Sequence, residues 1–191
     1  MNSVSWFKIK ERLKFLYQAH NAHGLHSPFA FELYNAIRRL LKVQKDDRAS
    51  GSFRSKSCLY TLALCDYIKA KRILVISDQD EKYWSACFSK KSQVTIVKSL
   101  EDLDVSERMF DVLFVDNQLI INEKERLVKL LDCMHNDSVV IIPHIHASKN
   151  ALEGWEKLKK EMAVRISIDL FFIGLVFIRR ESTKQDFLIR L

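Results

Sequence analysis

The sequence predicts an α/β protein whose mostly parallel sheet is covered by helices on both faces. From residue 58 onward, short apolar runs that are typical of buried strands alternate with amphipathic helical segments. Two further apolar runs follow at 164–171 and 174–180. They are too close together for a crossover connection, so we expect them to pair as an antiparallel hairpin.

Residues 1–45 are predicted to form a helical segment in front of this domain. In 4–20, apolar side chains recur at helical spacing, and the stripe comprises Trp6, Ile9, Leu13, Leu16 and His20. We expect the stripe to pack on the domain; the alternative is a membrane-surface or partner helix, because basic residues flank it. Ser27 is a suitable N-cap for a second helix. Residues 46–57 are polar and rich in small side chains, which predicts a linker or loop.

The α/β domain is expected to cover 58–191. The predicted helices are 58–70, 81–91, 123–135 and 147–162, and the predicted strands before the hairpin are 72–77, 94–97, 110–116 and 137–145. Only residues 98–109 separate two of these strands, which leaves no room for a helix, a further strand and a connection. Relative to the family that the sequence resembles, as described below, this is about one βα unit shorter than usual. Strand 94–97 should therefore lie beside 72–77, since a gap within a sheet would leave backbone groups unpaired.

A net charge of +7 raises the question of an anionic partner. The basic residues are spread over many segments without a nucleic-acid-binding motif, so we expect no nucleic acid partner. The longest apolar run, 170–178, is too short to cross a bilayer, and we expect no integral membrane segment. The N-terminus lacks a secretory signal pattern and the four cysteines lack metal-binding spacing, which predicts a reduced, cytoplasmic protein without disulfides.

Several stretches of the chain match a known pattern. AHGLHSPFAFELY contains a signature of the form HG-x-HSPF-x-F, and the C-terminal half contains FDVLFVD, NDSVVIIPHIHASKNALEGWEKLK, ISIDLFFIGLVFIRR and FLIRL. Together they resemble a bacterial family of class I S-adenosylmethionine-dependent methyltransferases. This resemblance implies a Rossmann-like methyltransferase fold with an antiparallel seventh strand, and S-adenosylmethionine as the cofactor.

The segments where the resemblance places the cofactor depart from the family pattern. The loop after the first strand is glycine-rich in such enzymes, which lets the backbone approach the cofactor closely, but residues 77–81 contain no glycine. Val75 stands where the first strand normally carries an acid. The acid that normally holds the ribose hydroxyls should fall near Val97 or Lys98, where no acid is present and Lys98 reverses the charge. The resemblance implies these residues as cofactor-binding candidates: Ser77, Asp78, Asp80 and Asp116. The departures predict lost or altered cofactor binding.

Chemistry could remain at the ends of two later strands. The resemblance implies Asp116 and His146 as catalytic candidates, while His144 stands where an acid is expected. His144 and His146 are two apart on a predicted extended segment, so they should point to one side. With Asp116 they could form a His₂-carboxylate metal site, although we favour polar residues at a sheet edge that need no ligand.

Three functional hypotheses follow. The first is a methyltransferase-like protein with lost or altered cofactor binding that acts as a non-catalytic binding protein. The second is an active methyltransferase with an atypical cofactor loop. The third is an interaction module that binds an anionic surface through its basic N-terminal helix. The partner could be a protein or a small molecule, and the sequence leaves a homo-oligomer open.

Overall fold

A computed structural model describes residues 3–21, 24, 26–46, 56–78, 84, 88, 92–99, 101, 109–116 and 124–191. These residues form a seven-stranded sheet with the order β2-β1-β3-β4-β6-β5-β7. The strands are β1 (Arg72–Ile76), β2 (Gln93–Val97), β3 (Phe110–Val115), β4 (Met134–Pro143), β5 (Ile166–Asp169), β6 (Ile173–Phe177) and β7 (Gln185–Leu188). The predicted linker 46–57 lies outside the described residues, except for Asp46, Lys56 and Ser57 at the ends of the neighbouring helices. The predicted helix 81–91 also lies outside them, except for the buried Trp84 and Phe88.

The first four strands form the parallel part of the sheet. β1 pairs with β2 on one side and β3 on the other, so Ile76 lies level with both Val97 and Val115. The predicted position of the 94–97 strand beside the first strand is therefore confirmed. β3 in turn pairs with β4 in parallel.

The predicted antiparallel hairpin is also confirmed. β6 lies antiparallel to both β4 and β5, and Phe171 in the tight connection has a positive φ of 68°. β7, which the sequence did not predict, pairs in parallel with β5 at the edge of the sheet. The α/β fold class with a C-terminal antiparallel pair is thus the observed one.

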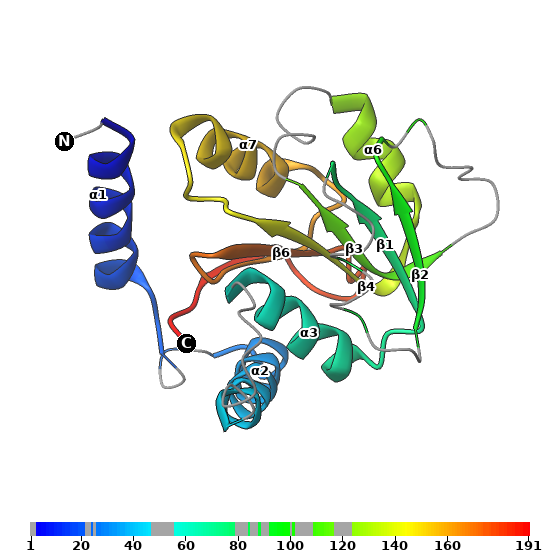
Figure 1. The fold of residues 1–191 in the computed structure, drawn as a ribbon, viewed down its shortest axis with the longest axis horizontal. Helices are drawn as coiled ribbons and strands as arrows, with labels where there is room; N and C mark the ends of the chain where they lie inside the picture. The colour runs from blue at the N-terminus through cyan, green and yellow to red at the C-terminus, as the bar shows by residue number, and fades with distance from the viewer. Residues whose placement is uncertain are drawn as a thin grey trace.

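Helices cover both faces of the sheet. α2 (Pro28–Asp46) and α3 (Lys56–Ile68) lie on one side, and α6 (Lys124–Asp132) and α7 (Lys149–Lys160) lie on the other (Figure 1). Side chains alternate along a strand, so each face of the sheet has its own hydrophobic core. Ile73 and Val75 of β1 pack in the core under α2 and α3, while Leu74 packs in the core under α6 and α7. None of the described helices is long and apolar enough to cross a membrane.

The second helix begins where its capping residues predict. The hydroxyl of Ser27 accepts a hydrogen bond from the backbone N–H of Ala30, at 3.4 Å. The predicted helix 123–135, in contrast, is shorter than expected. α6 ends at Asp132 and β4 already begins at Met134, which corrects the predicted boundaries of 135 and 137. The early start brings His135 next to β3, where it forms polar contacts that are described below.

α1 (Ser3–Gln18) packs on the domain, but not through the predicted stripe. Trp6 and Leu13 are 61% and 63% exposed, whereas Glu11 and Phe15 are buried. Phe15 contacts Phe171 in the β5–β6 connection, with ring centroids 5.3 Å apart. The prediction was wrong about the face because α1 has apolar side chains on two sides, and only tertiary contacts select between them. α1 therefore stands beside the sheet at the end where the hairpin turns (Figure 1).

Candidate functional site

The carboxyl ends of β1 and β3 form the first part of the candidate site. Strand order changes direction here, because β2 lies on one side of β1 and β3 on the other. In open α/β sheets, ligands bind in the crevice at such a switch point. The backbone N–H of Asp116 donates to the carbonyl of Ile76 at 3.0 Å, which places Asp116 beside the segment that begins with Ser77 and Asp78. Three of the four predicted cofactor-binding residues are therefore neighbours, while Asp80 lies outside the described residues.

The end of β2 adds a positive charge to this edge. The N–H of Ser77 donates to the carbonyl of Val97 at 3.1 Å, so the exposed Lys98 directly follows a residue that is paired with the β1 end. A lysine ammonium can only donate hydrogen bonds. This edge therefore carries a donor at the position where the resemblance implies a carboxylate acceptor.

The two histidines after β4 differ in their exposure. β4 ends at Pro143, and His144 adopts a left-handed backbone conformation with φ of 59°, which starts a turn. His144 is exposed while His146 is buried, but both line the same cavity, which is described below. No group of three potential metal ligands occurs within the described ranges, and these histidines and Asp116 do not form one.

His146 instead forms a buried cluster with two acidic residues. Its Nε2 lies 2.7 Å from Oδ2 of Asp169, the last residue of β5. An ionised carboxylate only accepts hydrogen bonds, so Nε2 carries the proton that Asp169 binds. Nδ1 lies 3.6 Å from Oε2 of Glu11 on α1 and has no hydrogen-bond partner in the described part of the chain. The imidazole of His146 therefore lies between the carboxylates of Asp169 and Glu11.

Asp169 also fixes the hairpin turn next to this cluster. Its Oδ1 accepts a hydrogen bond from the backbone N–H of Phe171 at 2.8 Å. The Phe171 ring stacks on the His146 ring with centroids 4.8 Å apart and an angle of 11° between the planes. The guanidinium carbon of Arg12 lies 4.5 Å from the centre of the same Phe171 ring. The carboxylate of Asp169 therefore binds both the His146 ring and the turn that contains Phe171. Arg12 packs on the Phe171 ring in this turn.

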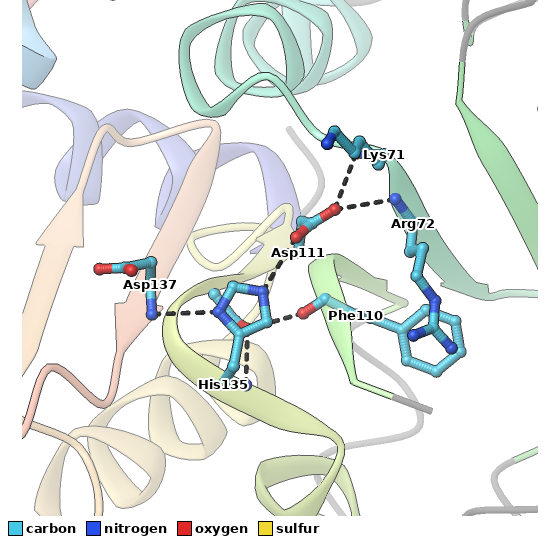
Figure 2. Close-up of polar contacts among 7 residues, drawn as sticks. Lys71, Arg72, Phe110, Asp111, His135 and Asp137 are labelled. Atoms are coloured by element: carbon cyan, nitrogen blue, oxygen red, sulfur yellow. Dashed lines mark hydrogen bonds and ion pairs between the residues drawn. The ribbon is translucent and has the colours of Figure 1, made fainter. Parts of the chain in front are cut away.

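A second histidine–aspartate pair lies at the opposite, amino end of the sheet (Figure 2). His135 Nε2 lies 2.9 Å from Oδ1 of Asp111, and its Nδ1 accepts a hydrogen bond from the N–H of Asp137 at 3.3 Å. The other carboxylate oxygen accepts from the N–H groups of Lys71 and Arg72, at 2.7 and 2.8 Å. This cluster joins the beginnings of β1, β3 and β4, and it lies away from the edge where α/β sheets bind ligands.

The environment of Asp111 stabilises its ionised form. Burial by itself would raise the pKa, but the N–H groups of Arg72 and Lys71 and the neighbouring His135 outweigh it and lower the pKa of Asp111. The buried Cys65 shows the opposite case, because burial raises the pKa of its thiol to about 12. Cys65 is therefore a neutral thiol within the core.

Sequence reasoning missed the partners of His146. Asp169 is a carboxylate that ends a fully buried strand, and Glu11 lies one helical turn from Phe7 and Phe15 on the same side of α1. An acidic residue in each of these apolar settings was the available signal. The pairing itself could not be predicted, because it depends on how α1 and the hairpin come together.

No protein-family model matches the chain, and no curated protein is similar enough in sequence to match it. Two similar solved structures are of phosphoethanolamine N-methyltransferase 2 from Haemonchus contortus. The complex with phosphomonomethylethanolamine and S-adenosylhomocysteine has 14% identity, a TM-score of 0.47 and coverage of 63% of this chain and 37% of that chain. The S-adenosyl-L-methionine complex has 16% identity, a TM-score of 0.48 and coverage of 65% and 38%. The chain thus spans well under half the length of these enzymes.

A third similar structure is the methyltransferase PaMTH1 from Podospora anserina, bound to S-adenosylhomocysteine. It has 11% identity and a TM-score of 0.46, and the match covers 93% of this chain and 96% of that chain. All three similarities are too distant to place a site or an activity on this chain.

Proposed function

We propose that this protein is a methyltransferase-like binding protein that has lost normal S-adenosylmethionine binding and does not transfer methyl groups. The methyltransferase-like character of the fold is supported by the position of β6. This strand lies antiparallel between β4 and β5, as the sequence resemblance implies. The two signature blocks also contact each other. Phe29 of the N-terminal block packs against Phe177 of the C-terminal block, with ring centroids 5.0 Å apart and nearly perpendicular planes.

The observation that carries the loss of cofactor binding is Lys98 at the end of β2. Ribose hydroxyls donate to an acid at this position in the enzymes that the sequence resembles, and a lysine offers no acceptor. Lys98 follows Val97, whose carbonyl binds the N–H of Ser77, so its positive charge lies beside the β1 end. The Lys98 side chain therefore does not fit the ribose of the cofactor.

The β1 end supports the same conclusion. Ser77 is buried and occupies the position that directly follows the strand, where a glycine-rich loop would begin. A glycine there would let the backbone approach a nucleoside closely, because it has no Cβ. The predicted acidic loop beyond Asp78 lies outside the described residues, so this support rests on Ser77 and Asp78 alone.

Isothermal titration with S-adenosylmethionine and S-adenosylhomocysteine tests the proposal. We expect no saturable binding up to about 1 mM ligand. An active class I methyltransferase in the same buffer is the positive control. Micromolar binding of either ligand would contradict the proposal and favour an active enzyme with an atypical loop.

A matched pair of variants tests the role assigned to Lys98. Lys98→Asp restores the carboxylate that the resemblance implies, and we expect it to strengthen any residual binding. Lys129→Asp makes the same charge change at an exposed position of α6 and should leave the titration unchanged. Equal effects of the two changes would mean that net charge, and not the position of Lys98, controls binding.

The outer face of α1 favours a second candidate function. Trp6 and Tyr17 are 61% and 92% exposed, and Lys10 and Lys14 are also exposed. Apolar side chains flanked by lysines are typical of helices that lie on anionic membrane surfaces. We propose binding to such a surface as the alternative function, with Arg12 excluded because it stacks on Phe171.

Sedimentation with lipid vesicles tests this alternative. We expect binding to vesicles that contain phosphatidylglycerol but not to vesicles of phosphatidylcholine alone, and we expect it to weaken with added salt. The double variant Lys10→Glu and Lys14→Glu should lose binding. Binding that is indifferent to lipid charge and to salt would reject the alternative.

We also propose a cytoplasmic location. Cys65 and Cys133 are buried free thiols, and free thiols are typical of reducing compartments. Fractionation of cells that produce the protein checks this, and recovery outside the cytoplasm would contradict it.

A further inference from the structure

A cavity of about 360 Å³ lies between α1 and the carboxyl end of the sheet. The turn after β4 and the β5–β6 connection form one wall, and α1 forms the other. The wall residues that matter here are Lys8, Ile9, Arg12, Leu13, Phe171 and Phe172. None of the described residues at the β1 and β3 ends lines this cavity, and these residues are Ser77, Asp78, Lys98 and Asp116. The cavity volume is within the range of small-molecule sites.

The lining of this cavity is apolar with a positive charge. Lys8 and Arg12 lie one turn apart on α1, so they are on the same side of the helix. No acidic residue is among the described lining residues. The nearby acids, Glu11 and Asp169, are directed to His146 instead. The cavity therefore combines two basic side chains with apolar walls.

Arg12 is held in a way that keeps its hydrogen-bond donors available. Its guanidinium carbon lies 4.5 Å from the ring centre of Phe171 and 5.4 Å from that of Phe172. A stacked guanidinium uses its face, while its N–H groups remain in the plane and match a carboxylate with two parallel hydrogen bonds. Within the described residues, no carboxylate forms an ion pair with Arg12.

The floor beneath Arg12 is rigid before any ligand binds. Asp169 binds both the N–H of Phe171 and Nε2 of His146, and the two rings stack. His146 is buried, and its Nδ1 faces the gap toward Glu11 without a hydrogen bond in the described part of the chain. Little ordering is therefore left for binding, which favours affinity.

We propose that this cavity binds a small organic carboxylate with an apolar body, and that Arg12 binds its carboxylate. Lys8 adds attraction at the open side, while Ile9, Leu13, Phe171 and Phe172 contact the apolar body. The inference rests on the proposed function in that it names the ligand of a binding protein. Because none of the described residues at the β1–β3 crevice lines the cavity, a titration with a carboxylate and a titration with S-adenosylmethionine can fail separately.

Isothermal titration of the full chain with 4-phenylbutanoate tests the proposal, and its alcohol, 4-phenylbutan-1-ol, is the neutral match. We expect saturable binding of the carboxylate and about tenfold weaker binding of the alcohol, since a charge-assisted pair with arginine is lost. Absence of saturable carboxylate binding would overturn the proposal. Equal affinity for the acid and the alcohol would overturn it as well.

Three variants locate the charge that is recognised. Arg12→Met should weaken 4-phenylbutanoate binding about tenfold and leave the alcohol unaffected, which also shows that the cavity is intact. Lys8→Met removes an exposed charge with little effect on folding and should cause a smaller loss. Lys10→Met, also on α1 but away from the cavity, should bind like the wild type. Wild-type affinity in Arg12→Met would overturn the proposal.

Discussion

Two histidine–aspartate pairs lie at opposite ends of the same sheet, and they are built differently. At the amino end, both ring nitrogens of His135 have hydrogen-bond partners and Asp111 accepts from two backbone N–H groups. At the carboxyl end, His146 is more deeply buried but one of its nitrogens has no hydrogen bond within the described residues. The amino-end pair is complete without a ligand, whereas the carboxyl-end pair borders a cavity. The first stabilises the fold, and the second borders the cavity that we propose as a binding site.

The largest expected effect is that of His146→Ala. It leaves Asp169 and Glu11 buried without their shared partner, which costs about 3–5 kcal/mol of unfolding free energy. His135→Ala is the matched change at the other end and should cost less, about 1–2 kcal/mol, because Asp111 keeps its two backbone donors. Urea unfolding at neutral pH measures both. Equal losses would remove the difference between the two pairs.

Gly174→Ala probes the strand that supports the carboxyl-end pair. Gly174 pairs with Asp169 across the hairpin, and a Cβ at this glycine would lie 2.6 Å from the Trp155 ring. We expect a loss of about 1–3 kcal/mol from overpacking. Thermal unfolding measures it, and the double variant with Trp155→Leu should lose less than the sum of the two single changes. Simple additivity would show that the ring is not what excludes a side chain.

Asp111→Asn tests the amino-end pair and has a defined pH dependence. At neutral pH we expect a loss of about 1–2 kcal/mol, because the single amide oxygen can accept from Lys71 and Arg72 or lie against His135 Nε2, but cannot do both. The pKa of Asp111 is lowered in the folded protein, so its contribution is fully present above the unfolded pKa and is lost as pH falls through the folded pKa. The difference between wild type and variant should therefore shrink in acid. A pH-independent difference in urea unfolding would contradict this.

Leu13→Ala should have the smallest effect. Leu13 is 63% exposed on α1, so its truncation should change stability by less than about 0.5 kcal/mol. Phe15→Ala on the same helix is the matched change at a buried position and should cost several times more. Equal costs in chemical denaturation would mean that α1 packs through the predicted stripe after all.

The fold was predictable from local patterns because alternating apolar runs and helices leave few arrangements for a parallel sheet. The close succession of β2 and β3 was predictable for the same reason, since 98–109 is too short to contain a helix, a further strand and a connection. β7 was missed because Gln185 and Asp186 break the apolar pattern at an exposed edge. The early start of β4 was missed because Met134 and His135 also suit a helix.

The candidate site was predictable only in part. The positions of Ser77, Asp78 and Asp116 follow from strand ends, which sequence patterns locate well. The cluster around His146 combines residues from α1, the turn after β4 and the end of β5, so its geometry depends on long-range packing. The backbone of His144 in a left-handed conformation also could not be foreseen, because no glycine marks the turn.

Amide NMR of the full chain during two titrations tests the central claim most directly. We expect 4-phenylbutanoate to shift the amide signals of Arg12, Ala147 and Phe172 around the cavity. We expect S-adenosylmethionine to leave the signals of Ser77 and Asp116 at the β1–β3 crevice unchanged. Saturable shifts of those two signals with S-adenosylmethionine, and none around the cavity with the carboxylate, would contradict it.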